Sequence, residues 1–578
     1  MIMIAVLVLL AFLLFSGVGF FIPWTLFRRE ATFDRLLSSF WVGWVLILAV
    51  LQVWNLFLPV ALAALILFAA AGLVGWFWAR ESVLAWLGGM KNVKTLVVVA
   101  LAIFPAFLIG NHVMFHAAHA DHAGYHMQVV KWISSYAIVP GLGNLQHRLA
   151  FNNANFLNAA LLNAGVLYGY SYYLSGSLMA YGLVLTCGMG IYRFFYPARC
   201  ASKTDLFYAL MTPLVIWEIS VMHVPGYSPD IPVFALQVIL AGELLKLFET
   251  SLEQAQFVQK AAYICLLAAA GIAIKMSFVI FGGLCVLVTL GAWIYRYHFN
   301  WRTTPLNWFK WLWPAALVLL VWMARSVILS GYPFYPSSIV SLPFPWIMPK
   351  DIVDSGAALV SIWARTWSNT IPDTHDWSWF LKWYKIFNIE PKQAFTFALA
   401  LMGLDGAAAV FLRRKARLDM PVMILVVLSA VSLVFWFVMA PDYRFAGANF
   451  WILLVSAFML GYQLLLEANL NVSPRFLALA GLLVITIWIS PNNFSNNLSP
   501  NLLLSPVPEY VFGSQAQERV GITHTQTPSG ITVYFPSGTV QECWDAPLPC
   551  TTRNDIYPGL KLFEPGNLQK GFYVGSNP

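Results

Sequence analysis

Five histidines and one acid are gathered in a short stretch of the chain, namely His112, His116, His119, Asp121, His122 and His126. Between residues 112 and 171, Asp121 is the only carboxylate. Ionisable groups next to apolar segments are costly in a membrane protein and therefore mark a functional site by default. A carboxylate among imidazole and aromatic rings can be tuned to act as a general base. We therefore predict that Asp121 is catalytic, the alternative being a helix cap or an exposed loop acid.

The histidines of this stretch form two sets at helical spacing, one at i, i+4, i+7 and one at i, i+4. Imidazoles on one helix face, together with an aspartate, could ligate a divalent metal such as zinc. The stretch has no HExxH pattern, and Gly124 interrupts it. We therefore expect a structural or hydrogen-bonding role for most of the rings and assign no metal. His116, His119 and His122 stay weak candidates for a divalent metal, and no other cofactor is predicted.

Polar side chains and a Pro-Gly turn follow Asp121 directly. Pro140, Gly141 and Gly143 are typical of a tight, fixed turn. Around it we expect a pocket wall with substrate-binding side chains, for which the candidates are Tyr125, His126, Lys131, Asn144, His147, Arg148 and Asn152. Arg148 can contact a phosphate through two parallel hydrogen bonds. The alternative for Arg148 is pairing with a lipid headgroup.

Three cations stand at the ends of apolar runs far apart in the sequence: Lys275, Arg325 and Arg444. At an outer membrane face, where few cations are expected, such groups favour an anionic partner, and a lipid-linked phosphate is one. Snorkelling to ordinary headgroups is the alternative. Asp442 precedes Arg444 by two positions and could pair with it or position an acceptor. Tyr332 follows Arg325 in the run RSVILSGYPFYP, and we expect it, with the three cations and Asp442, to be a substrate-binding candidate.

The composition indicates the elements that must position these groups. Of 578 residues 60% are hydrophobic and only 10% are charged, whereas soluble domains carry roughly a quarter charged residues. Apolar runs long enough to cross a bilayer recur along the chain. We predict an all-α polytopic membrane protein with about 13–14 transmembrane helices, at 2–25, 38–58, 60–79, 95–115, 172–195, 205–223, 230–250, 261–275, 277–296, 310–330, 392–412, 421–440, 446–466 and 474–491.

Every second connection between these segments is short and contains Lys and Arg, and together these connections hold most of the basic residues of the chain. Basic residues concentrate in short cytoplasmic loops, so we predict that the membrane face with these connections is cytoplasmic. The first segment has no basic n-region and no small-residue cleavage site, so we expect an uncleaved helix. The predicted parts are N-terminal transmembrane helices (1–111), a first long periplasmic segment with Asp121 (112–171), a transmembrane core (172–330), an aromatic-rich periplasmic loop (331–391), C-terminal transmembrane helices (392–491) and a periplasmic tail (492–578). The net charge of +8 is then mostly a topology signal. A nucleic-acid-binding protein would have a basic patch with interleaved aromatic residues. The sequence has no such patch, so we predict no nucleic-acid partner.

The tail differs in composition from the helical part. It begins with Asn, Ser and Pro and continues with alternating β-branched and aromatic residues such as GITVYFPSG. We predict a small outward-facing cap of mixed or β character. Its run CWDAPLPC holds Cys543 and Cys550, which suit a local disulfide in an oxidising compartment better than a zinc site, because no second Cys or His pair follows.

Four motifs carry a family resemblance: the run DHAGYHMQVVKWISSYAIVPGLGNLQHRLAFN, and then RSVILSGYPFYP, APDYRF and CWDAPLPCT. They resemble the signature of uncharacterised bacterial multi-pass membrane proteins. That group is similar in turn to the GT-C glycosyltransferases, which include protein O-mannosyltransferases and aminoarabinose transferases. The resemblance implies a GT-C-like fold in the bacterial inner membrane, and inverting transfer from a polyprenyl-phosphate sugar with Asp121 as base. Two departures are that three helices precede the one that delivers Asp121, and that the loop has no Asp-Glu pair.

The leading hypothesis is thus a glycosyltransferase whose partners are membrane lipid, a polyprenyl-phosphate-linked sugar and a glycan, lipid or protein acceptor. A cell-envelope polysaccharide polymerase or ligase is the first alternative, since it would use Arg and His without a strict carboxylate base. A lipid or glycan transporter is the second, and it would place ionisable groups near the bilayer midplane in repeated halves. The sequence specifies neither the sugar nor the acceptor, nor the oligomeric state.

Overall fold

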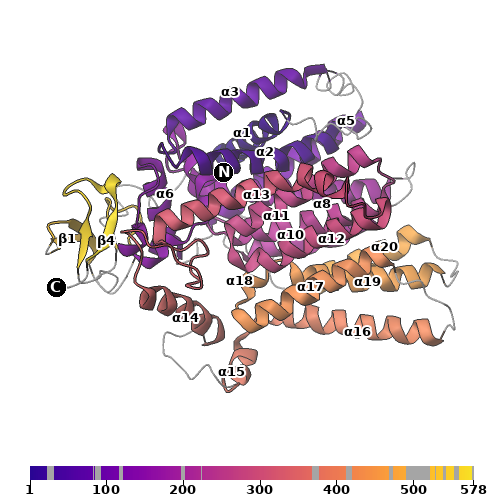
Figure 1. Cartoon of the computed structure of the whole chain (residues 1–578). Coiled ribbons are helices and arrows are strands. Elements are labelled where there is room, and N and C mark those ends of the chain that lie inside the picture. The colour runs from indigo at the N-terminus through magenta and orange to yellow at the C-terminus, as the bar shows by residue number, and fades with distance from the viewer. Residues whose placement is uncertain are drawn as a thin grey trace.

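A computed structural model describes most of the chain, and Figure 1 shows its arrangement. The described residues are 1–21, 32–81, 84, 93–115, 121–196, 202–222, 224–366, 377–411, 419–467, 473–489, 521–527, 529–537, 542–551 and 559–575. Long helices lie side by side in one bundle, and the strands of the C-terminal region gather at one end of it (Figure 1).

Each of the fourteen apolar segments predicted from the sequence coincides with a helix. These helices are α1 (Ile2–Gly19), α2 (Thr32–Trp54), α3 (Leu62–Trp78), α5 (Val93–Phe115), α8 (Ser171–Phe195), α9 (Lys203–Val221), α10 (Asp230–Glu249), α11 (Gln254–Ile274), α12 (Val279–Tyr297), α13 (Thr304–Ser330), α16 (Ile389–Phe411), α17 (Met420–Met439), α19 (Asn449–Glu467) and α20 (Pro474–Ile489). Within the described residues, ten helices are long and apolar enough to cross a membrane, and three shorter apolar helices accompany them. The predicted helical, multi-pass class is confirmed at this level.

Local sequence signals explain where several of these helices begin and end. Ser202 caps α9 by accepting a hydrogen bond from the amide of Asp205 at 3.0 Å. Helix α11 begins with a capping box formed by Glu253 and Gln256. Helix α13 ends at Gly331, whose φ of 86° is the left-handed conformation that terminates helices. Helix α10 is buried over almost its whole length, so it lies at the centre of the bundle.

One end of the bundle, called the cap end below, carries the short elements. These are the π-helical turn η2 (His122–His126), α6 (Met127–Ser135), the 3-10 turns η3 (Leu142–Asn144), η4 (His147–Ala150), η5 (Gly165–Leu167) and η6 (Met276–Phe278), and the helices α7 (Asn155–Leu161), α14 (Lys350–Thr366), α15 (Trp379–Ile386) and α18 (Tyr443–Ala446). In Figure 1, α6, α14, α15 and α18 lie at the same end as the strands.

The predicted C-terminal cap is confirmed as two small antiparallel sheets. Strand β1 (Ile522–Gln526) pairs with β2 (Thr532–Pro536), and β3 (Leu560–Leu562) pairs with β4 (Phe572–Val574); η10 (Leu568–Lys570) is a turn between the last two. The predicted disulfide between Cys543 and Cys550 is present. The cap is anchored on the Pro-Gly turn, because the amide of Phe572 donates to the carbonyl of Pro140 at 2.9 Å.

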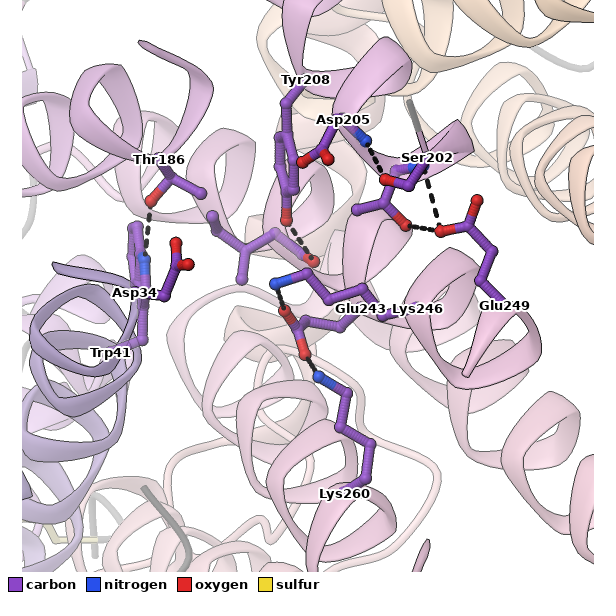
Figure 2. A network of polar contacts seen from close by, with 12 residues as sticks. Asp34, Trp41, Thr186, Ser202, Asp205, Tyr208, Glu243, Lys246, Glu249 and Lys260 are labelled. Atoms are coloured by element: carbon purple, nitrogen blue, oxygen red, sulfur yellow. Dashed lines mark hydrogen bonds and ion pairs between the residues drawn. The ribbon is translucent and has the colours of Figure 1, made fainter. Parts of the chain in front are cut away.

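Ion pairs link the helices toward the opposite end of the bundle, and Figure 2 shows those of Glu243. Glu243 on α10 accepts hydrogen bonds from Lys246, at 3.0 Å, and from Lys260 on α11. Arg193 at the end of α8 pairs with Asp34 of α2 and, at 2.6 Å, with Asp205 of α9. These contacts lie beside connections that the sequence predicts as cytoplasmic. Buried charges need such partners, because an unpaired one is strongly destabilising.

Candidate active site

Asp121 lies immediately before η2, at the cap end of the bundle. Over residues 122–126 the chain forms a π-helical turn, in which the amide of Met127 donates to the carbonyl of His122. Turns of this kind are rare in proteins, but those that occur are frequently found at functional sites. The extra residue in such a turn redirects the neighbouring side chains. The turn leads into α6, so Asp121 is held at the start of a continuous rigid element.

Four charged side chains from three other parts of the chain surround Asp121. Arg444 on α18 lies 3.5 Å from Asp121, 3.9 Å from Asp230 and 3.4 Å from Asp442. Lys275, directly after α11, pairs with Asp230 at 2.5 Å. Helix α10 begins at Asp230 and α11 ends before Lys275, so two consecutive antiparallel helices bring this pair together. The five residues are called the Asp121 cluster below.

The three carboxylates of the Asp121 cluster differ in their access to solvent. The side chain of Asp121 is 35% exposed, whereas those of Asp230 and Asp442 are 10% and 6% exposed. Asp442 caps α18 by accepting from the amide of Arg444 at 2.9 Å, and Ser228 donates to Asp230 at 2.9 Å. Asp121 is therefore the carboxylate of this cluster that a substrate can reach.

The charge balance of the cluster also favours a proton acceptor. Three carboxylates face two cations, so the five groups carry one negative charge in excess. Burial works to lower the pKa of Arg444, but Asp230, Asp442 and Asp121 outweigh it and raise the pKa above its ordinary value. Arg444 thus stays charged and can orient the carboxylate of Asp121.

Aromatic rings form the wall next to the Asp121 cluster. Burial, and then the negative charge of Asp121, raises the pKa of Tyr125, so its hydroxyl stays protonated. The guanidinium of Arg148 lies 5.9 Å from the centre of the Tyr125 ring. Arg148 is exposed, and none of the ion pairs of the described residues involves it. The ring of His126 packs between Tyr125, at 4.4 Å, and Phe156, at 5.2 Å.

The structure places His122 in an aromatic cage. Its ring centre lies 4.8 Å from those of both Tyr172 and Tyr227, and neither ring nitrogen has a hydrogen-bond partner among the described residues. Burial, and then the neighbouring His126, lowers its pKa well below the usual value, so the ring is neutral. Within the described residues no group of three or more His, Cys, Asp or Glu side chains could hold a metal. His116 and His119 lie outside the described residues.

Lys131 is directed to the cap rather than to the Asp121 cluster. It pairs with Asp545 at 3.0 Å and donates to the carbonyls of Asp545 and Ala546. The loop closed by the disulfide also receives hydrogen bonds from Gln128, and the amide of Trp544 donates to the carbonyl of Ala123 in η2 at 2.9 Å. The cap therefore braces the turn that follows Asp121.

Arg325 and Asn152 lie together, but outside the Asp121 cluster. Both line a small cavity, with Phe151 and Phe156. The rings of these two phenylalanines contact Tyr125 and His126 respectively, so an aromatic layer lies between the cavity and the residues that follow Asp121. Arg325 forms its hydrogen bonds with Gln52 and Asn55 of the α2 region.

The remaining candidates make structural contacts at the cap end. The side-chain amide of Asn144 donates to the carbonyl of Trp346 at 2.8 Å. The carbonyl of His147 accepts from the hydroxyl of Tyr335, and the buried Tyr332 donates to the carbonyl of Met348. Their predicted role in substrate binding stays a prediction.

Two residues of this region, Asp230 and Glu218, are not predicted from the sequence. Asp230 could have been found, because the start of one apolar helix and the end of the next lie side by side in an antiparallel pair, which places Asp230 opposite Lys275. Glu218 is buried on α9 and accepts hydrogen bonds from Tyr443 and, at 2.9 Å, from Trp451. It therefore fixes the residue that precedes Arg444. No sequence signal links Glu218 to Tyr443, which is 225 positions away.

A comparison with protein families bears on the helical part and on most of this site. A family model described as a domain of unknown function, DUF8201, matches residues 1–452. The chain belongs to the DUF8201 family. The matched region contains all five residues of the Asp121 cluster and ends before the cap, so the brace on η2 comes from outside the DUF8201 match. No curated protein and no solved structure matches the chain.

Proposed function

We propose that this DUF8201 protein is an integral-membrane glycosyltransferase of GT-C type, which transfers a sugar from a polyprenyl-phosphate donor to a cell-envelope acceptor. The single observation that carries the proposal is the Asp121 cluster, in which one accessible carboxylate is held by a buried network of charges. We place the protein in the bacterial inner membrane with the cap end facing the periplasm. The GT-C-like topology rests on the resemblance given above.

In the proposed reaction, the carboxylate of Asp121 removes the proton from an acceptor hydroxyl. The acceptor oxygen then attacks the anomeric carbon, the bond from that carbon to the phosphate oxygen breaks, and polyprenyl phosphate leaves with the bonding electrons. A positioned base contributes about 10²–10⁴-fold to such a step. Uptake of the proton by Asp121 removes the excess negative charge of the cluster, and Arg444 holds the side chain of Asp121 in the same geometry between turnovers.

The leaving phosphate needs a cation that is not already neutralised. Lys275 and Arg444 are both engaged by Asp230, whereas Arg148 is exposed and stacks near Tyr125. Arginine presents several N–H groups in a plane that matches a phosphate. We therefore assign the donor phosphate to Arg148. The aromatic segment around α14 and α15 can stack on sugar rings or lie in the membrane interface.

The two alternative functions, a polymerase or ligase and a transporter, differ from the transferase in the charged residues that they need. A polymerase or ligase that works through Arg and His tolerates the loss of Asp121. A transporter has ionisable groups near the middle of its helices, whereas the ion pairs described above lie within about two turns of helix ends. The transferase is therefore the function that we favour.

The test is a transfer assay with the purified full chain in lipid nanodiscs. A panel of radiolabelled polyprenyl-phosphate sugars is offered with a membrane extract as acceptor source, and release of polyprenyl phosphate is measured. We expect release with at least one donor, and loss of about 10²-fold or more in Asp121→Asn. Asp351→Asn is the matched control, because Asp351 is an exposed aspartate at the start of α14 outside the cluster. Undiminished release by Asp121→Asn would favour the polymerase or ligase.

A further inference from the structure

The cavity that Arg325 lines has no role in the proposed reaction. It lies at the cap end, where the end of α2, helix α6, the segment around η4 and helix α13 meet. It has about 30 Å³ of space, which is room for one small anion or about two water molecules, since a water needs at least about 10–15 Å³. Apart from its polar residues, the lining is made of Ala, Val, Ile, Leu and aromatic side chains.

Arg325 brings a positive charge to this cavity without a carboxylate partner. Its side chain is buried, with 3% of the residue exposed. Its two terminal nitrogens donate to neutral acceptors, the carbonyl of Gln52 at 3.2 Å and Oδ1 of Asn55 at 3.1 Å. No ion pair of the described residues includes it. A buried charge without a counter-charge is strongly destabilising, so this guanidinium requires an anion.

Three buried N–H donors around the cavity have no partner among the described residues: Nε of Arg325, Nε1 of Trp132 and Nδ2 of Asn153. The amide of Asn153 cannot simply be reversed, because its Oδ1 already accepts from the amide of Asn155 at 2.9 Å. Buried polar groups are rarely left unpaired. All three groups are donors, so they call for an acceptor rather than for another donor.

We propose that this cavity is a binding site for one small anion, which accepts hydrogen bonds from Arg325, Trp132 and Asn153. Water could accept the same hydrogen bonds, but it would leave the charge of Arg325 uncompensated. The anion is either a free one of the size of chloride or a phosphate oxygen of a lipid headgroup. Both have the same chemistry here, and the site is independent of the proposed transfer reaction.

The test uses thermal unfolding of the purified full chain in a phosphate-free maltoside detergent. The baseline buffer contains sodium gluconate, whose anion is too large for the cavity. Sodium chloride at the same concentration, or phosphatidylglycerol in gluconate, is then added, and diacylglycerol without a phosphate is the lipid control. We expect at least one of the two anions to raise the Tm by about 2 °C or more, because a ligand that binds the folded state stabilises it.

Two variants connect this shift to the cavity. Trp132→Phe keeps an aromatic side chain and removes one donor, so the shift should fall to about half or less. Arg325→Met removes the charge, so the shift should vanish. Trp311→Phe is the matched control. Like Trp132, Trp311 is buried and its Nε1 has no partner among the described residues, but it lies on α13 and does not line the cavity. It should retain the full shift.

The outcomes distinguish the two sources of the anion, a free ion and a lipid headgroup, and they also test whether the site exists. A shift with chloride alone identifies a free anion, and a shift with phosphatidylglycerol but not diacylglycerol identifies a headgroup phosphate. An unchanged Tm with both anions, or an equal shift in Trp132→Phe and Trp311→Phe, overturns the proposal. If Arg325→Met does not fold, the Trp132→Phe comparison decides alone.

Discussion

Replacing Asp121 by asparagine should abolish transfer while leaving the fold almost unchanged. The side chain of Asp121 is 35% exposed, and its ion pair with Arg444 has a length of 3.5 Å. A pair this exposed is worth about 0–1 kcal/mol of unfolding free energy. Arg444 keeps Asp230 at 3.9 Å and Asp442 at 3.4 Å in the variant, so Arg444 is not left unpaired. The expected change in Tm is therefore within about 2 °C.

Asp230→Asn is the informative contrast, because it removes a carboxylate of the same cluster that a substrate cannot reach. Asp230 holds both Lys275, at 2.5 Å, and Arg444. Breaking a buried pair in this way costs about 3–5 kcal/mol, since Lys275 is left with an uncompensated charge. Asp230→Asn should consequently lower the Tm by several degrees more than Asp121→Asn does.

The assay measures Tm and polyprenyl-phosphate release on the same preparations. In Asp121→Asn we expect a loss of about 10²–10⁴-fold in transfer at nearly native Tm. If Asp121→Asn instead destabilises the protein as strongly as Asp230→Asn, its effect on transfer is structural and the assignment of a base is wrong. Native stability together with native transfer would refute the reasoning just as directly.

Three further predictions concern the surroundings of the site. Changing Cys543 and Cys550 to serine should lower the unfolding free energy of the cap by about 2–3 kcal/mol, because the disulfide closes a short loop between residues seven positions apart. The measurement is hydrogen exchange of the Trp544 amide, which should become faster. His122 has a lowered pKa in the folded state, so its contribution to stability is complete above about pH 6.5 and is lost as the pH falls below it; His122→Gln should flatten the stability profile between about pH 5 and 6.5 in thermal unfolding. Gly141→Ala should destabilise the cap by about 1–3 kcal/mol, because φ is +64° and a Cβ would lie 2.1 Å from the carbonyl oxygen of Phe572, whereas Gly188→Ala, which meets nothing within 4 Å, should leave limited proteolysis of the cap unchanged.

The helices could be predicted from the sequence because their signal is local. Every apolar run of about twenty residues satisfies its own backbone hydrogen bonds as a helix, whatever its neighbours are. The ends were less well predicted where polar residues continue a helix. For example, α11 begins at Gln254 rather than at 261, because Glu253 and Gln256 form a capping box before the apolar run starts.

The site was predicted only in part, because its contacts join distant segments. Asp121 and Arg444 each stood out as an isolated charge, and the structure brings them together although 323 positions separate them. Lys275 also belongs there. Arg325 stood out by the same criterion, yet it lies in the cavity behind Phe151 and Phe156, because helix order and not charge decides which helix ends become neighbours. The π-helical turn after Asp121 has no recognisable sequence signal.

The brace between Trp544 and Ala123 gives the protein an order of assembly. The segment that bears the proposed base is made early in synthesis, whereas the loop that supports it is made more than four hundred residues later. That loop is closed only when two thiols have been oxidised. In the proposed function, the base is therefore supported by this loop only after the last part of the chain has been made and cross-linked.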